Sequence, residues 1–179
     1  MSEHQRVGRD PGEPDPDGPD GHGRWADYLD WVREELIEGV LTLAPNAQRR
    51  PLVPSGWTAL ELLSHVLHME QRWFLWGFLG EPVAEPWGDW DVEEPWETTG
   101  GRWRVADDVT AEELVARLRE LGRRTSEVLA THPPESRASS RGRFAEDPPT
   151  LEWICFHVLA EYARHAGHLD IALELSTRN

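Results

Sequence analysis

The chain has 179 residues, 39% of them hydrophobic, which suits one globular domain, and it contains no run of about 18 consecutive apolar residues that could span a membrane as a helix. Its 33 acidic and 18 basic residues give a formal net charge of −15 at pH 7, which repels phosphate backbones and anionic headgroups and argues against nucleic acid and membranes as partners. The first residues lack the apolar core of a secretory signal and Cys155 is the only cysteine, so we expect a cytoplasmic protein without an intrachain disulfide.

The first 23 residues differ in composition from the rest of the chain. Residues 9–23 combine Pro, Gly and Asp without any aliphatic side chain, so they cannot bury enough apolar surface to offset the entropy of ordering. We therefore predict a disordered acidic tail over residues 1–23 and a single domain over residues 24–179. His4 and His22 fall in this tail and are set aside as site residues.

Two amphipathic helices are predicted in the first half of the domain. The first covers residues 25–43, where apolar positions recur at intervals of three and four. The second begins after Thr58, which is followed three residues later by Glu61 in the pattern of a capping box, and it ends near residue 79. This second helix is apolar almost all round, so we expect it to be central.

Two more helices are predicted in the second half. Thr110 and Glu113 repeat the capping-box pattern and open a helix that ends near residue 130. Thr150 follows two prolines and caps a helix that reaches about residue 175. Four long helices in one small domain predict an all-α four-helix bundle, whose interior is where ligands for metals and cofactors usually converge.

The connection between the second and third helices is long and has no periodicity. Residues 80–109 contain many acids, prolines and glycines together with four tryptophans, Trp87, Trp90, Trp96 and Trp103. A loop of this length is either functional or disordered, and the tryptophans favour a packed loop that lies across the bundle.

Three polar side chains fall inside apolar helical stripes. At about 100° per residue, Glu161 and His165 lie on the same side of the fourth helix as Val158 and Leu169. On the second helix, His65 likewise lies inside the apolar stripe of that helix. His157 and His168 lie at the other edge of the fourth helix's stripe, and Arg72 lies near the margin on the second.

The buried carboxylate requires a partner, because burying an unpaired charge costs several kcal/mol. In one interpretation Glu161 pairs with Arg164 or Arg72 and the histidines are hydrogen-bonded core residues. In the other, His65, Glu161 and His165 bind one divalent metal ion. Two imidazoles and one carboxylate leave an open coordination position, as in catalytic metal sites. Spacing alone leaves both interpretations open.

Two segments carry a resemblance to a known superfamily. PSGWTALELLSHVLHMEQRWF, residues 54–74, and LEWICFHVLAEYARHAGHLDIALEL, residues 151–175, resemble the DinB-like superfamily of four-helix metalloproteins. The chain is most similar to the actinobacterial branch related to the N-terminal domain of mycothiol-dependent maleylpyruvate isomerase. The likeness runs from about Trp25 to Leu175.

The resemblance implies a metal held by one His of the second helix and by two residues four apart on the fourth. The matching positions are His65, Glu161 and His165, with Glu161 where many relatives carry a histidine. The metal is divalent, and Zn, Ni, Fe and Mn are not distinguished. Three further side chains are assigned to holding the ligands in place or to touching the substrate: His168, His157 and Arg72.

The function implied by the resemblance is that of an S-transferase or isomerase that uses a low-molecular-weight thiol such as mycothiol. The metal would hold the thiol as a thiolate, which would attack an electrophilic small-molecule substrate. No catalytic side chain is assigned, and Cys155 is interpreted as a small core residue. The alternatives are a metal-dependent hydrolase and a non-catalytic metal- or ligand-binding bundle. A homodimer is also expected to be possible.

Overall fold

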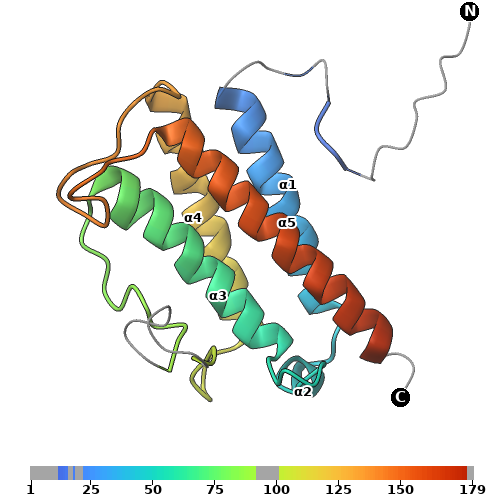
Figure 1. Cartoon of the computed structure of the whole chain (residues 1–179). Coiled ribbons are helices and arrows are strands. Elements are labelled where there is room, and N and C mark those ends of the chain that lie inside the picture. Colours follow the sequence, from blue (N-terminus) through green and yellow to red (C-terminus); the bar gives the residue numbers. More distant parts are fainter. Residues whose placement is uncertain (1–11, 16–17, 19–21, 92–100, 177–179) are drawn as a thin grey trace, which may run out of the picture.

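The computed structural model describes residues 12–15, 18, 22–91 and 101–176, and within these residues the only β-type pairing is at isolated bridges. The helices are α1 (His22–Leu41), α2 (Pro45–Gln48), α3 (Ala59–Gln71), α4 (Ala111–Thr131) and α5 (Leu151–Ser176), and α3 continues as a π-helix, η1 (Arg72–Leu79). The four long helices form a bundle in which α1 lies beside α4 and α5, and α3 lies beside the same two helices (Figure 1). None of the described helices combines the length and apolar character needed to cross a membrane. The predicted all-α bundle is confirmed.

The helix starts follow from local capping. The Thr58 hydroxyl accepts a hydrogen bond from the backbone N–H of Glu61 at 3.1 Å, and the Glu61 carboxylate accepts from the Thr58 N–H at 2.7 Å. Thr110 and Glu113 make the same reciprocal pair at 3.2 and 2.9 Å. The Thr150 hydroxyl accepts from the backbone N–H three residues further on, at 3.3 Å. Each cap satisfies donors that the first helical turn leaves unpaired.

The bounds of α1 differ slightly from the prediction. The helix begins at His22, three residues before the predicted start at Trp25, and it ends at Leu41 rather than Leu43. Two residues assigned to the tail therefore belong to the helix. Most of the predicted tail, including His4, lies outside the described residues, and its disorder stays a prediction.

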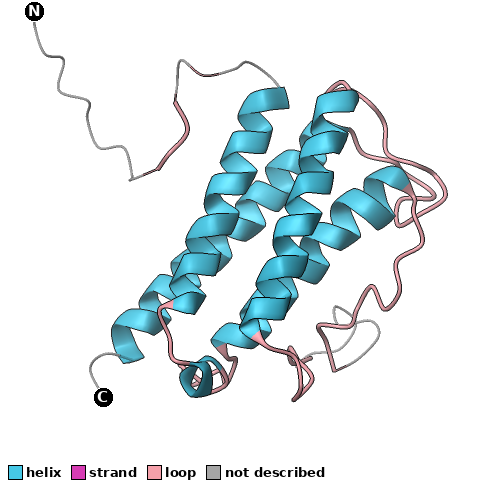
Figure 2. Cartoon of the chain, turned by 180° about the vertical axis from the view of Figure 1, so that it is seen from behind, coloured by secondary structure: helices cyan, strands magenta, loops and turns pink. Residues whose placement is uncertain are grey.

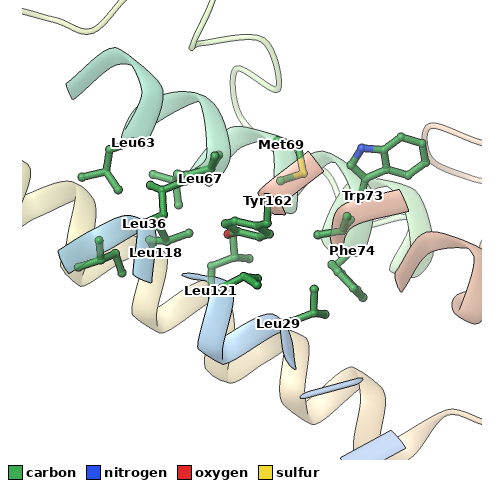
Figure 3. Close-up of a cluster of buried hydrophobic side chains, with 14 of the residues drawn as sticks. Leu29, Leu36, Leu63, Leu67, Met69, Trp73, Phe74, Leu118, Leu121 and Tyr162 are labelled. Carbon is green, nitrogen blue, oxygen red and sulfur yellow. The ribbon is translucent and has the colours of Figure 1, made fainter. Parts of the chain in front are cut away.

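The core is centred on α3, as its all-round apolar character predicted. Every residue from Ala59 to Glu70 except Glu61 is buried. Figure 3 shows Leu67 of α3 facing Leu36 of α1 and other apolar side chains of α4 and α5. This packing fixes α3 and α5 against each other, and those two helices carry the predicted site residues.

A polar cluster lies in the middle of the core. Glu70 is fully buried, and its carboxylate accepts hydrogen bonds from Arg33 at 2.9 and 3.0 Å, from the Thr125 hydroxyl at 2.5 Å and from the Tyr162 hydroxyl at 2.5 Å. Burial and the neighbouring Glu70 carboxylate raise the pKa of Tyr162 well above its ordinary value, which keeps this hydroxyl a donor. The four residues come from α1, α3, α4 and α5, so the cluster joins all four helices of the bundle.

The chain leaves η1 by a turn that needs glycine. Gly80 has a positive φ of 68°, and a Cβ atom there would collide with the hydroxyl oxygen of Ser139. The connection then runs back alongside α3 (Figures 1 and 2). Its two described parts are joined by backbone hydrogen bonds, from Asp91 N–H to the Arg102 carbonyl at 3.0 Å and from Arg104 N–H to the Asp89 carbonyl at 2.9 Å. Trp96 lies outside the described residues.

Candidate functional site

The three predicted metal ligands are neighbours between α3 and α5. The His165 Nε2 atom lies 3.4 Å from a carboxylate oxygen of Glu161, and the rings of His65 and His165 lie 4.9 Å apart between centroids. Both histidines are buried. Among the described residues, no three His, Cys, Asp or Glu side chains form a group with the geometry of a metal site as they stand. The structure brings the three side chains together, and their role as ligands stays a prediction.

A loop carboxylate fixes the orientation of His65. Its Nδ1 atom lies 2.8 Å from an oxygen of Asp89, which is fully buried. Although burial opposes the shift, hydrogen bonds from His65 and Arg72 lower the pKa of Asp89, so this carboxylate is ionised and can only accept. Burial lowers the pKa of His65 to about 4, despite the opposing effect of Asp89. At neutral pH the imidazole is therefore uncharged, with its proton on Nδ1 and a lone pair on Nε2.

Aromatic rings of the long loop hold the same imidazole from the sides. The Trp103 ring stacks on His65 at 4.3 Å and 19°, and the Trp90 ring meets it edge-on at 5.7 Å. The described part of this loop is thus packed on the bundle, as the tryptophans predicted. Nothing in the sequence indicated that the contact would be with a predicted metal ligand.

Arg72 is more buried than the sequence suggested and has a different partner. It is 3% exposed and pairs with Asp89 through two hydrogen bonds, at 2.5 and 3.1 Å. It also donates to the carbonyl of Pro86 at 2.9 Å, and its guanidinium lies 4.3 Å from the centroid of Trp87. The predicted alternative of an Arg72 pair with Glu161 is not found. Arg72 instead helps Asp89 to hold His65.

Glu161 lies at the margin of the buried stripe rather than deep inside it. Its side chain is 19% exposed and pairs with Arg164 at 2.9 Å, the partner that the interpretation without a metal predicted. Interaction with His165 first, and with Arg164 second, lowers the pKa of Glu161 to about 2 although partial burial opposes this. The carboxylate is therefore charged and already has partners. Its charge is compensated without a metal ion.

The two flanking histidines occupy different surroundings. His157 is half-buried, stacks on Trp153 at 5.4 Å and 19°, and contacts Trp73 at a centroid distance of 4.0 Å. Burial lowers the pKa of His157. His168 is exposed, with its ring centroid 5.8 Å from that of His165. Of these two histidines, His157 is the one placed to contact a molecule bound beside Glu161.

A cavity of about 270 Å³ opens beside these groups. Its apolar wall is formed by Met69, Trp73, Trp87 and Trp90. Its polar groups are His65, Arg72, Arg143, His157 and Glu161. A chamber with an aromatic wall and a few polar groups is typical of small-molecule sites.

Two side chains that help to form this region were missed by the sequence reasoning. Asp89 and Arg143 lie in connections without periodicity, and each is one of many charged residues there. No local pattern could have identified them. Cys155, in contrast, is a buried core residue as predicted, and burial, with a smaller effect of Glu152, raises its pKa to about 12.

These features define the class of protein, a four-helix bundle with His and Glu side chains gathered between two of its helices. A family model described as mycothiol S-transferase matches residues 25–177, and the chain belongs to this family. The suspected DinB-like relationship is confirmed.

Among solved structures, the chain is similar to YfiT from Bacillus subtilis, described as "a probable metal-dependent hydrolase with an unusual four-helix bundle topology". The TM-score is 0.54 and the sequence identity is 20%, over 92% of this chain and 91% of that one. At this identity the likeness shows the fold alone. The comparison with curated proteins gave no match.

Proposed function

We propose that this protein is a metal-dependent S-transferase that joins a mycothiol-like thiol to electrophilic small molecules. In this proposal His65, Glu161 and His165 hold a divalent metal ion. The observation that carries it is the contact of Glu161 with His165 at 3.4 Å, beside the buried ring of His65. Membership of the mycothiol S-transferase family supports the choice of thiol.

The protonation states of His65 and Glu161 suit a metal ion. Ligands must be deprotonated, and the pKa of about 4 for His65 and of about 2 for Glu161 keep both ready at neutral pH. The carboxylate of Asp89 behind His65 is the partner that metal-bound imidazoles usually have. A bound divalent ion would lower the pKa of a thiol so that it is available as thiolate near neutral pH.

The aromatic residues of the cavity contribute to holding the bound molecules. Trp73, Trp87 and Trp90 give the cavity an apolar wall that excludes water from the bound molecules. Cys155 is buried and its pKa of about 12 makes it a poor nucleophile. The nucleophilic sulfur is therefore that of the thiol substrate.

A metal-dependent hydrolase is the second candidate. The same two imidazoles and carboxylate would suit an ion that activates water, and the structural neighbour YfiT is described as a hydrolase. The third candidate is a non-catalytic bundle that would bind a metal ion through the same three residues. Thiol binding separates the transferase from both alternatives.

The test is elemental analysis of the purified chain, followed by titration of the cobalt-substituted protein with a small thiol. One ion per chain and a sulfur-to-metal charge-transfer absorption that saturates with thiol are expected. A Cys155→Ala variant is the matched control, because it removes the chain's own sulfhydryl and should give the same absorption. Metal content without thiol binding would favour the alternatives, and absence of metal would reject every metal-dependent function.

We also propose a homodimer through the outer face of α5. Three large apolar side chains there are exposed, Trp153 by 51%, Phe156 by 58% and Ile171 by 59%. Exposed apolar side chains gathered on one face mark association surfaces. Phe156→Glu should therefore reduce the mass in analytical ultracentrifugation from dimer to monomer. Ala116→Glu is the matched control, because it adds the same charge at an exposed position of α4 and should leave the mass unchanged.

A further inference from the structure

Arg143 is a half-buried cation of the cavity without an acidic partner among the described residues. It lies in the connection between α4 and α5, and its backbone N–H donates to the Trp76 carbonyl at 3.3 Å. Its guanidinium lies 4.2 Å from the Trp73 ring centroid and 5.5 Å from that of Trp87. Within the part of the chain that the structure describes, its buried Nη1 atom has no hydrogen-bond partner.

The other charged groups of the cavity are already compensated. Arg72 is paired with Asp89, and Glu161 is paired with Arg164. Burial first, and repulsion by Arg72 second, lower the pKa of Arg143 to about 10, which shows how poorly its surroundings solvate the charge, although it stays protonated at neutral pH.

A buried donor without a partner is unfavourable, and a ligand that supplies the acceptor removes this cost. A guanidinium presents parallel N–H donors that match the two oxygens of a carboxylate. The aromatic wall next to it suits an apolar or planar body attached to that carboxylate.

We propose that Arg143 is a specificity-determining residue that binds the carboxylate of a small organic acid in this cavity. The substrate class of the site is then a carboxylate-bearing molecule with an apolar body. The role of this acid in catalysis rests on the proposed S-transferase function, but binding of the acid does not require the metal ion. The carboxylate belongs either to the electrophilic substrate or to the thiol.

The test uses isothermal calorimetry of the full chain after chelation of metal, with benzoate as the probe and benzamide as its uncharged counterpart. Benzoate should bind at least about tenfold more tightly than benzamide, and Arg143→Gln should remove this preference. Arg143→Lys keeps the positive charge and should retain part of the preference for benzoate. Arg141→Gln is the matched control, because this exposed arginine of the same connection does not line the cavity. Thermal melts of each variant check that the fold is kept.

Two thiols distinguish the source of the carboxylate in the metal-loaded protein. If the thiol supplies it, Arg143→Gln will weaken N-acetylcysteine and leave N-acetylcysteinamide unchanged. If the other substrate supplies it, Arg143→Gln will leave both thiols unchanged, and benzoate will still bind in the presence of the amide. Equal benzoate affinity in Arg143→Gln and the unmodified chain, or equal affinity for benzamide and benzoate, would overturn the inference. Arg143-dependent benzoate binding in a protein that takes up no metal would instead reject the proposed function alone.

Discussion

Asp89→Asn tests whether the long loop controls the candidate metal ligand. The substitution keeps the shape of the side chain but removes the charge that accepts hydrogen bonds from His65 at 2.8 Å and from Arg72 at 2.5 and 3.1 Å. Loss of the carboxylate should make the imidazole less basic and less firmly oriented. The expected result is weaker binding of the metal ion.

The size of the effect follows from the position of Asp89. Loss of a carboxylate behind a metal-bound imidazole costs about 10–100-fold in metal affinity, which is about 1.4–2.7 kcal/mol. In the metal-free protein, Asp89→Asn leaves the Arg72 guanidinium buried without its ionic partner, and removal of one member of such a pair costs about 3–5 kcal/mol. The two effects are distinct and need separate measurements.

Metal affinity is measured by competition with a chromogenic chelator, and the free energy of unfolding by urea denaturation of the metal-free protein. Asp91→Asn is the matched control, since this exposed acid is two residues away and neither His65 nor Arg72 pairs with it. It should leave both quantities unchanged. A stably folded Asp89→Asn variant that binds the ion as tightly as the unmodified chain would refute this account of the site.

Three other substitutions and one pH dependence test the remaining assignments. His165→Ala should abolish stoichiometric metal binding with the helical circular dichroism kept, whereas His168→Ala, at an exposed position, should weaken it far less; similar effects would mean that the two roles are wrongly assigned. Glu70→Gln should lower the free energy of unfolding, measured in urea, by about 3–5 kcal/mol, because it leaves the buried Arg33 guanidinium without the carboxylate that it pairs with in the core. The pKa of His65 is about 4 in the folded chain and about 6.5 when unfolded, so the unfolded state takes up the proton first. Stability of the metal-free protein should therefore fall as pH decreases from about 6.5 to 4, by about 3 kcal/mol at most, and a His65→Gln variant should lack this loss.

The helices could be predicted because their signals are local. Thr58 with Glu61 and Thr110 with Glu113 are capping pairs within one turn, and both form as the spacing indicated. The pairing of Glu161 and His165 is also local, since residues four apart share a helix face. Placing His65 opposite them required the family resemblance, because the sequence does not state which faces of two helices meet.

The π-helix explains why the rotation of about 100° per residue became unreliable after residue 71. A π-helix has more residues per turn than an α-helix, so side chains beyond Gln71 are turned progressively away from their predicted directions. Arg72 is the first residue of this segment, so its burial (3% exposed) comes instead from the loop that carries Asp89. Trp76, within the π-helix, is only half-buried.

A helical wheel also gives direction but not depth. It placed Glu161 within an apolar stripe, yet that side chain lies at the edge of the bundle, where Arg164 reaches it from solvent. Among the acids of the described helices, the one that is fully buried is Glu70, which Arg33 of α1 faces across the core. Whether a buried acid is neutralised depends on contacts between helices, and a single helix does not show them.

The distribution of the site between helices and loops suggests separate origins for metal binding and substrate preference. His65, Glu161 and His165 lie on helices whose relative position is fixed by the apolar core, so their arrangement depends on packing far from the cavity. Asp89 and Arg143 reach the same region from two connections: Asp89 orients His65, and Arg143 lines the cavity as the proposed carboxylate-binding group. Because loops accept changes that a packed core does not, substitutions near Arg143 should change the proposed preference for an acid while the candidate metal ligands keep their geometry.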